Sequence, residues 1–244
     1  MEKITSLQNA KVKFWTSLKD KKSRDLHGLF IIEERHLIEE AFNAGVLESL
    51  LYLTGDIPYV NAPELYECTE GILKKVSGTV SQNRQIGIAK KTPVHSEENR
   101  VFLLDEVQDP GNVGTIIRTA KSFGFDTVIL SEGCADPYGH KAIRSTQGAL
   151  FSLNVRYGNL SEEIQALKNR GIPVYGTSLK DAVPLDEITP VKQAAIILGN
   201  EGNGVKQELL SLCDQKIRIP MEGFESLNVA IAGGILAYAF RKHQ

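Results

Sequence analysis

The sequence contains few cysteines, and their positions exclude two classes of site. The three cysteines among the 244 residues, Cys68, Cys134 and Cys213, lie far apart in the chain. None of them forms a Cys-x-x-Cys pair, so the sequence predicts neither a zinc site nor a disulfide framework, and we expect no bound metal. An odd number of widely spaced cysteines suits a reducing compartment such as the cytoplasm.

Long apolar runs are also absent. No stretch approaches the roughly 18 to 20 apolar residues that a membrane-spanning helix needs, and the first residues are polar and charged, without an apolar signal core. We therefore expect a cytoplasmic protein with no membrane partner. The chain is 42% hydrophobic and 24% charged, which is typical of a globular protein, and its length suffices for one large or two modest domains.

The chain has no excess of positive charge, because its formal net charge is −2. Any contact with nucleic acid must therefore come from a local basic patch. Near the start of the chain, basic residues far outnumber Glu2 and Asp20: they are Lys3, Lys11, Lys13, Lys19, Lys21, Lys22 and Arg24. Charge alone favours a solvated surface for this patch.

A polar segment separates two parts of the chain. The first part is predicted to be a small α/β unit, with a helix over residues 33–44, a short helix over 71–76, and strands at 50–53 and 85–89. Residues 90–100 are polar, include a proline and show no apolar period. We therefore expect a first domain over residues 1–92, a linker over 93–99 and a second domain over 100–244.

Apolar runs and helical patterns alternate in the second part. We expect strands at residues 101–104, 127–130, 173–175, 195–198 and 217–219, and helices at 113–123, 164–169 and 227–240. Such alternation predicts a parallel sheet that is covered on both faces. The ligand site of such a sheet lies at the carboxyl ends of its strands, where three loops are of interest.

The first loop, Asp105–Arg118 (DEVQDPGNVGTIIR), follows a buried strand and opens a helix. Residues 109–111 form a turn, and Asn112 is expected to cap the helix. Arg118 follows Gly114 by four residues, so its guanidinium can return toward the loop. Taken alone, this pattern favours a capped helix with a surface arginine.

The second loop, Ile196–Gly204 (IILGNEGNG), exposes backbone groups through three glycines. It lacks the Lys-Ser/Thr of a phosphate-binding loop, and Glu201 would repel phosphate, so a backbone-lined pocket for a neutral or cationic ligand fits better.

The third loop, Ile217–Ala232 (IRIPMEGFESLNVAIA), leads from a strand into a helix, with Ser226 as the expected N-cap and Asn228 just inside. Taken alone, a glycine turn and a capped helix explain these two loops.

Together and in this order, the three loops resemble the motifs of the SpoU/TrmH group of SPOUT RNA methyltransferases. They match D-x-x-x-D-P-x-N-x-G-x-x-x-R, then L-G-N-E-G-x-G, then I-P-M-x-G followed by E-S-L-N-V. Residues 136–151 also resemble the segment that follows motif one in this family. The resemblance is strong over residues 100–240. It is fainter at residues 24–33 and 85–89, which are similar to the substrate-binding domain of the family.

The resemblance implies an α/β protein with two parts. A C-terminal parallel-sheet SPOUT domain with a deep trefoil knot would hold S-adenosyl-L-methionine, and a small N-terminal α/β domain of L30e-like fold would bind RNA. The family works as homodimers through the knotted domain. The largely apolar helix 227–240 is consistent with burial against a partner, and equally with an ordinary core. The implied reaction is methyl transfer to a ribose 2′-hydroxyl, with ribosomal RNA favoured over transfer RNA.

The resemblance also assigns residues to the site. The catalytic residues would be Arg118, Asn112, Glu201, Ser226 and Asn228. The cofactor-binding residues would be Thr177, Leu198, Gly199, Gly202, Ile219 and Leu227. The RNA-binding residues would be Lys11, Lys13, Lys21, Lys22, Arg24, Lys141 and Arg144.

The roles of the catalytic residues follow from their chemistry. Arginine is effectively always charged, since its pKa exceeds about 12, so we expect Arg118 to stabilise the developing alkoxide or to clamp a phosphate. Asn112, Ser226 and Asn228 would orient Arg118 and the ribose by hydrogen bonds. Glu201 would either pair with Arg118 or accept a hydrogen bond from a loop amide.

Other functions remain open at this point. A methyltransferase of the same fold could modify a base, although Ser-Leu-Asn-Val in motif three is typical of the ribose-modifying branch. A non-catalytic RNA-binding or ribosome-assembly protein could keep the fold, although it would not need all of Asn112, Arg118, Glu201 and Asn228. A Rossmann-type nucleotide enzyme is disfavoured, because no G-x-G-x-x-G follows the first strand of either domain.

Overall fold

The computed structural model describes residues 2–78, 83–189, 191–222 and 226–241, and the chain divides into two compact units. The N-terminal unit comprises Met1–Pro93 and Tyr138–Ser152, and the C-terminal unit comprises Val94–Pro137 and Leu153–Gln244. The chain thus leaves the C-terminal unit after residue 137, contributes a segment to the N-terminal unit, and returns at residue 153.

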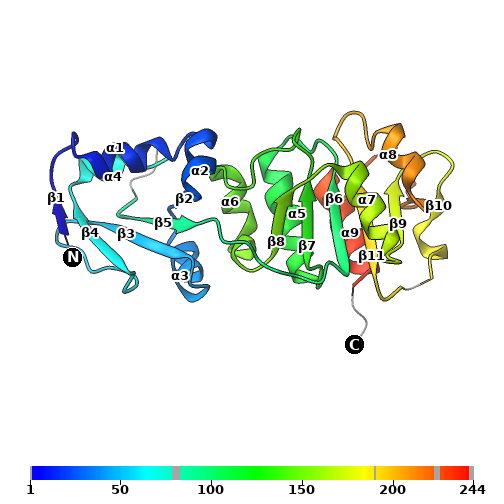
Figure 1. Ribbon diagram of the computed structural model, residues 1–244, viewed down its shortest axis with the longest axis horizontal. Coiled ribbons are helices and arrows are strands. Elements are labelled where there is room, and N and C mark those ends of the chain that lie inside the picture. Colours follow the sequence, from blue (N-terminus) through cyan, green and yellow to red (C-terminus); the bar gives the residue numbers. More distant parts are fainter. Residues whose placement is uncertain (1, 79–82, 190, 223–225, 242–244) are drawn as a thin grey trace. The chain divides into compact units, whose positions relative to one another are not determined.

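The N-terminal unit contains a mixed sheet of strand order β1-β4-β3-β5-β2 (Figure 1). The strands are β1 (Glu2–Ile4), β2 (Leu29–Ile32), β3 (Leu47–Leu53), β4 (Glu64–Cys68) and β5 (Gln85–Lys90). Strands β1, β4 and β3 run parallel, and β5 is antiparallel to both β3 and β2. The helices are α1 (Ala10–Ser17), α2 (Lys21–His27), α3 (Arg35–Asn43), α4 (Glu70–Val76) and α6 (His140–Thr146), followed by the 3-10 turn η1 (Ala149–Phe151).

Helices cover both faces of this sheet (Figure 1). Val12 and Trp15 of α1 and Ile72 of α4 join a buried cluster with Leu51 and Ile86 of the strands. The amphipathic pattern predicted for residues 33–44 is confirmed as α3, whose Leu37 and Ile38 are buried. Hydrophobic burial of this kind is the main source of the stability of the unit.

The segment 138–152 packs onto β2. The ring of Phe30 lies 5.1 Å from that of Tyr138 and 6.2 Å from that of Phe151, measured between centroids. His140 Nε2 lies 2.9 Å from a carboxylate oxygen of Glu33, whose side chain is almost fully buried. These contacts explain why α6 belongs to the N-terminal unit.

The C-terminal unit is built on a parallel sheet of order β10-β12-β9-β11-β6-β7-β8, which confirms the predicted α/β architecture. Its strands are β6 (Arg100–Leu104), β7 (Thr127–Leu130), β8 (Asn154–Tyr157), β9 (Val174–Thr177), β10 (Val183–Pro184), β11 (Ala194–Leu198) and β12 (Gln215–Arg218). Its helices are α5 (Pro110–Ser122), α7 (Leu160–Asn169), α8 (Gln207–Leu212) and α9 (Val229–Ala239), with the 3-10 turn η2 (Leu185–Glu187).

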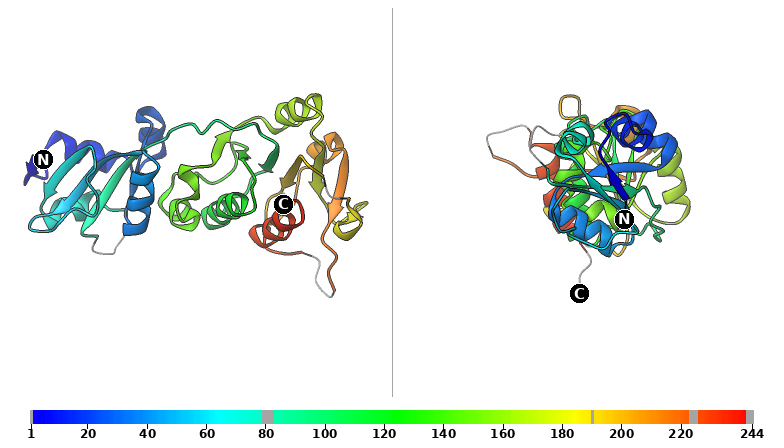
Figure 2. Two further views of the ribbon diagram at one scale, coloured as in Figure 1. Left: turned by 90° about the horizontal axis from the view of Figure 1, so that it is seen from below. Right: turned by 90° about the vertical axis from the view of Figure 1, so that its left-hand side faces the viewer.

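The two faces of this sheet are covered by different helices. Figure 2 shows α5 and α9 on one side of it and α7 and α8 on the other. Alternate side chains of β6 serve the two layers: Leu103 packs in a cluster with Ile164 and Leu209, whereas Phe102 stacks on Phe125 at 4.2 Å. Every residue of β6 is buried, as expected for a central parallel strand.

Two classes of feature are missing from the part of the chain that the structure describes. None of its helices combines the length and the hydropathy that crossing a bilayer requires. None of its clusters of His, Cys, Asp and Glu side chains, taken three or more together, is arranged to bind a metal ion.

Candidate active site

The two helices that border the site begin at residues other than those predicted. Asp109, not Asn112, caps α5: its Oδ1 accepts hydrogen bonds from the backbone N–H groups of Gly111 at 2.7 Å and Asn112 at 3.0 Å. Proline at the first helical position needs no hydrogen-bond partner, so α5 starts at Pro110, three residues earlier than expected. The side chain of Asn112 is therefore released from capping and can interact with another loop.

Asn228, not Ser226, caps α9. Its Oδ1 accepts hydrogen bonds from the N–H groups of Ala230 at 2.9 Å and Ile231 at 3.3 Å. Helix α9 consequently begins at Val229, and Ser226 lies exposed before it. Residues 223–225 of motif three lie outside the described residues.

A chain of hydrogen bonds joins one residue from each of the three motifs. Asn112 Nδ2 donates to Glu201 Oε1 at 2.9 Å, and Asn228 Nδ2 donates to Asn112 Oδ1 at 3.1 Å. The backbone N–H groups of Asp109 and Gln108 also donate to the Glu201 carboxylate, at 3.3 and 3.4 Å. The structure thus brings together three of the five predicted catalytic residues.

The environment of Glu201 favours its ionised form. Partial burial raises the pKa of this carboxyl, but the hydrogen bonds from Asn112 and from the amides of its own loop and of Asp109 and Gln108 outweigh burial, so that the pKa lies below its ordinary value. An ionised Glu201 accepts hydrogen bonds only. It therefore fixes which way the Asn112 amide faces, with Nδ2 toward Glu201 and Oδ1 toward Asn228.

Asn200 holds the second motif as a closed turn, and sequence reasoning missed it. Its Oδ1 accepts from the N–H groups of Gly202 at 2.9 Å and Asn203 at 3.1 Å, and its Nδ2 donates to the carbonyl of Glu106 at 2.9 Å. Its backbone also pairs with that of Gly204. An asparagine that binds backbone N–H groups two and three residues on is typical of such turns, so its residue type was the available signal.

Gly199 is required by lack of space. A Cβ atom at this position would lie 2.2 Å from both Gly204 C and Val205 N. These are backbone atoms and cannot rotate away as a side chain can. The end of β11 and the return of the loop therefore pass each other at a distance that only glycine permits.

A second residue missed by sequence reasoning, Asp105, anchors the far side of this loop. Its Oδ2 accepts from the backbone N–H of Lys206 at 2.8 Å, and Lys206 Nζ donates to Glu106 Oε1 at 2.5 Å. Burial raises the pKa of Asp105 above its ordinary value, and the bond from the Lys206 amide only partly offsets this. Motif one is thus bound both to motif two and to Lys206, which follows it.

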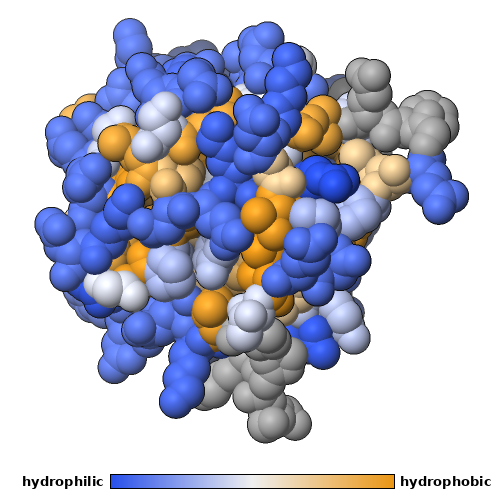
Figure 3. Space-filling view, turned by 90° about the vertical axis from the view of Figure 1, so that its right-hand side faces the viewer, coloured by the Kyte–Doolittle hydropathy of each residue, from blue (hydrophilic) through white to orange (hydrophobic). Residues whose placement is uncertain are grey.

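A cavity of about 600 Å³ opens beside these loops. All six predicted cofactor-binding residues line it: Thr177, Leu198, Gly199, Gly202, Ile219 and Leu227. Glu201 and Ser226 also line it. The Thr177 hydroxyl already donates a hydrogen bond to the carbonyl of Ile197 at 2.9 Å. Figure 3, which views this unit from the side of β10, shows apolar surface interrupted by polar side chains.

The residues around the cavity suit S-adenosyl-L-methionine. Its size lies within the range of small-molecule sites. Its walls combine the apolar side chains of Leu198, Ile219 and Leu227, which suit the adenosyl ring, with loop backbone groups that can bond to its edges. The Glu201 carboxylate supplies negative charge, which suits a sulfonium.

Arg118 lies exposed on α5, and the structure shows no side-chain partner for its guanidinium among the residues that it describes. Glu201 was expected either to pair with Arg118 or to accept a hydrogen bond from a loop amide. It accepts from loop amides, and the described residues contain no ion pair between Glu201 and Arg118. Asn112 and Asn228 bond to each other and not to Arg118.

The predicted RNA-binding residues all lie in the N-terminal unit, in two groups. In the first group, Lys13, Lys21 and Lys22 are exposed, whereas Lys11 is bound to Glu2 at 2.7 Å and to the Tyr66 hydroxyl at 2.8 Å. Lys11 donates these hydrogen bonds, and the bond to the Glu2 carboxylate, followed by that to Tyr66, holds the pKa of Lys11 above its usual range.

Arg24 takes a structural position instead of the expected surface one. It is buried, and its guanidinium donates to the carbonyls of Leu18 at 2.9 Å and Lys19 at 2.6 Å, just beyond the end of α1. The second group, Lys141 and Arg144, is exposed on α6.

The sequence matches two family models. Residues 99–238 match the SpoU rRNA Methylase family, and residues 9–87 match the MRM3-like substrate binding domain. Over 250 residues the chain is 38% identical to the 23S rRNA (guanosine(2553)-2′-O)-methyltransferase RlmP of Bacillus subtilis, covering 99% of this chain and 100% of the relative. It is 30% identical over 259 residues to an uncharacterized tRNA/rRNA methyltransferase of Synechocystis, covering 99% and 94%.

Solved structures show the same similarity over nearly the whole chain. An rRNA methyltransferase from Sinorhizobium meliloti with bound AdoMet has a TM-score of 0.85 and 30% identity, covering 97% of this chain and 96% of that one. A structure described as an RNA 2′-O ribose methyltransferase has a TM-score of 0.80 and 28% identity, covering 97% of both chains. The two-part fold is therefore shared with SpoU-type methyltransferases.

Proposed function

Because the chain belongs to the SpoU rRNA Methylase family, we propose that it transfers a methyl group from S-adenosyl-L-methionine to a ribose 2′-hydroxyl of ribosomal RNA. The observation that carries this proposal is the hydrogen-bonded series Glu201–Asn112–Asn228, which lies beside a cavity lined by residues of the second and third loops. A purely binding protein has no need of a fixed polar series at a cavity that suits this cofactor.

The relative from Bacillus subtilis favours ribosomal RNA as the substrate. The Bacillus subtilis protein, which the chain matches from end to end, is named as a 23S rRNA guanosine 2′-O-methyltransferase. A 23S guanosine is therefore the first nucleotide to examine, and transfer RNA is the alternative. Ribosomal RNA as substrate also supports the cytoplasm as the compartment.

Bound S-adenosyl-L-methionine would supply a methyl group on a sulfonium, which is already a good leaving system. The residues of this chain would then position the ribose and assist loss of its proton. The Glu201 carboxylate orients Asn112, and Asn112 orients Asn228. Their remaining hydrogen-bonding positions would then meet the ribose in a fixed geometry. Arg118 would stabilise the developing alkoxide or hold a phosphate, because its own charge is permanent.

We propose a homodimer through the C-terminal unit. On α9, Ile231, Ile235 and Tyr238 remain 56%, 37% and 57% exposed. They recur at intervals of four and three residues, so they share one face of the helix. Exposed apolar residues grouped in this way support a partner surface. The deep trefoil knot is part of the same proposal and rests on the family resemblance.

The experiment is incubation of the purified protein with methyl-labelled S-adenosyl-L-methionine and unmodified total RNA, followed by digestion and identification of the labelled nucleoside. We expect a 2′-O-methylnucleoside from ribosomal RNA, with the label lost in Arg118→Ala. The matched control is Lys121→Ala, which removes one positive charge from the same helix and should retain activity.

Other results would redirect the proposal. A methylated base would indicate base modification, and label in RNA of transfer-RNA size would indicate the alternative substrate. No label with intact cofactor binding by calorimetry would point to an assembly intermediate or an intact subunit as the substrate. No label and no cofactor binding would overturn the proposal of an enzyme.

A further inference from the structure

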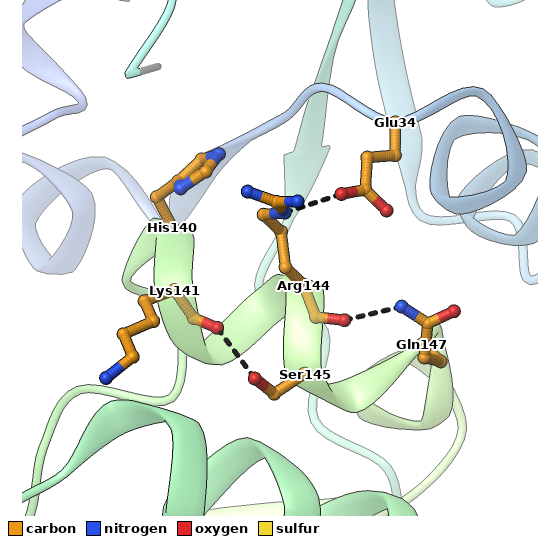
Figure 4. A pocket seen from close by; sticks show the side chains of 6 residues that line it. All are labelled: Glu34, His140, Lys141, Arg144, Ser145 and Gln147. Atoms are coloured by element: carbon orange, nitrogen blue, oxygen red, sulfur yellow. Dashed lines mark hydrogen bonds and ion pairs between the residues drawn. The ribbon is translucent and has the colours of Figure 1, made fainter. Parts of the chain in front are cut away.

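The N-terminal unit contains a second cavity, of about 400 Å³, which lies on α6 (Figure 4). It is lined by Glu34, His140, Lys141, Arg144, Ser145 and Gln147. Five of these residues belong to α6 or follow it directly, and Glu34 is the N-cap residue of α3. The motifs of the proposed active site contain none of them.

The lining of this cavity is rich in hydrogen-bond donors. Its two cations, the Arg144 guanidinium and the Lys141 ammonium, face the single carboxylate of Glu34. The Ser145 hydroxyl and the Gln147 amide also line it, and each donates one hydrogen bond to a carbonyl of α6. Arginine, lysine, serine and glutamine side chains are the groups that proteins use to contact nucleic-acid phosphates. The chemistry of the lining therefore fits an anion with several oxygen atoms.

The carboxylate of Glu34 forms an ion pair with Arg144. Arg144 Nε lies 2.5 Å from Glu34 Oε1, and Figure 4 shows the two side chains reaching toward each other across the cavity. The side chains are 56% and 31% exposed, and an ion pair this open to solvent is weak. A phosphate can therefore replace the Glu34 carboxylate as the partner of Arg144.

The frame around the cavity does not depend on this ion pair. The neighbouring Glu33, whose side chain is 2% exposed, lies 2.9 Å from His140 Nε2 and accepts from the N–H of Gly78 at 2.5 Å. Phe30 packs against the rings at both ends of the segment 138–152. Replacing Glu34 or Arg144 should therefore leave α6 in its place.

Gln147 ends α6 in a left-handed conformation with a φ of 50°, which is a common way for a helix to end. Its amide donates to the carbonyl of Arg144 at 2.7 Å. The chain therefore turns directly after the helix that carries Lys141 and Arg144.

The segment before α6 is tied to motif one. Ser131 Oγ accepts from the N–H of Glu106 at 2.9 Å, and the N–H of Ala135 donates to the carbonyl of Val107 at 2.9 Å. The chain reaches α6 from β7, and the residues between these two elements are hydrogen-bonded to the motif-one loop.

We propose that this cavity binds a backbone phosphate of the RNA substrate, and that Glu34 acts as an internal competitor that occupies Arg144 until the phosphate arrives. This inference rests on the proposed function, since it takes RNA as the substrate. Lys141 and Arg144 are already expected to bind RNA. The inference adds a backbone phosphate as their ligand and Glu34 as a residue that weakens binding, so it predicts that removing the Glu34 carboxylate should strengthen RNA binding.

The test measures the affinity of the full-length protein for a fluorescent in vitro transcript of 23S rRNA, by anisotropy at several salt concentrations. Arg144→Ala should weaken binding about tenfold and lower the slope of log Kd against log salt by about 1, because one phosphate contact is lost. Glu34→Gln should tighten binding about threefold or more. The double variant should lose this gain, because Glu34 acts through Arg144.

Asp56→Asn is the matched control for charge. It removes one negative charge from the same unit and breaks another exposed ion pair, between Asp56 and Arg84, which does not line the cavity. Its affinity should stay within about twofold of wild type. The proposal is overturned if Glu34→Gln behaves like Asp56→Asn, or if Arg144→Ala leaves the salt slope unchanged.

The same preparations separate this inference from the proposed function. If the affinities change as expected while the labelled product is a base, the subsite stands and ribose methylation fails. If a 2′-O-methylnucleoside forms while the affinities of all variants equal that of wild type, the subsite fails and the proposed function stands.

Discussion

Gly199→Ala should disable the cofactor cavity through one added methyl group. The new Cβ would lie 2.2 Å from Gly204 C and Val205 N and 2.5 Å from Gly204 O, far inside van der Waals contact. The backbone conformation of Gly199 is not left-handed, so the requirement is for space alone. Relief requires the loop 199–205 to move away from β11, and the cavity that this loop lines would change shape.

The loss of stability in Gly199→Ala depends on which atoms the new Cβ would contact. Overpacking typically costs about 1–3 kcal/mol, and we expect the upper end because the contacts are with backbone. For a chain of this length, roughly 3 kcal/mol corresponds to a fall in Tm of about 6–12 °C. We also expect at least a tenfold weaker Kd for S-adenosyl-L-methionine, which equals about 1.4 kcal/mol.

Differential scanning fluorimetry and calorimetry measure these two quantities. Gly71→Ala is the control, because an added Cβ at Gly71 would meet nothing within 4 Å and Gly71 does not line the cavity. Its Tm should not fall, and its Kd for the cofactor should stay within about twofold of that of wild type. A Gly199→Ala protein with the Tm and Kd of wild type would refute the reasoning.

Four further predictions concern single groups. Arg118→Ala should abolish methyl transfer in the nucleoside assay and leave Tm within about 1 °C of wild type, because Arg118 is exposed. Glu201→Gln should reduce kcat at least tenfold and Tm by a few degrees, since an amide cannot accept all the hydrogen bonds that reach Glu201; unchanged kcat would contradict this role. The pKa of Glu201 is lowered from 4.5, so the ionised carboxylate stabilises the fold above pH 4.5, and this contribution is lost as the pH falls through the lowered pKa. When Tm is measured against pH, Glu201→Gln should therefore lose less Tm below about pH 4.5 than wild type does. Burial raises the pKa of the Cys68 thiol to about 12 and that of Cys213 to about 11, so iodoacetamide at pH 8 should label neither in the native protein, as mass spectrometry would show.

The sequence predicted those parts of the fold that hydrophobic pattern alone determines. The buried runs 101–104, 127–130 and 195–198 became β6, β7 and β11 to within one residue, because central parallel strands are apolar on both faces. Helices with a marked apolar face, such as α3, were equally accessible. The meeting of Asn112, Glu201 and Asn228 also followed, since loops at the carboxyl ends of parallel strands share one edge of the sheet, here those after β6, β11 and β12.

Other features could not be predicted, because two nearby residues of suitable type could serve the same role or because the local pattern was too short. Asp109 and Asn112 can both cap a helix, and Pro110 decided for Asp109 by fixing the first helical position. Ser226 and Asn228 competed in the same way. The charge of Arg24 suggested surface, yet carbonyls at the end of α1 bind it in the interior. Short strands such as β10, with two residues, leave no pattern to detect.

The segment 138–152 determines how the chain can be divided into fragments or recombined in chimeras. The N-terminal unit is completed by a stretch of chain encoded within the C-terminal unit, and the ring of Phe30 is covered from that stretch. A fragment that ends at residue 93 would expose this apolar surface and lack both cations of α6. The two units are therefore not separable modules in the gene: a chimera that exchanges RNA specificity between relatives must transplant two discontinuous pieces of sequence together.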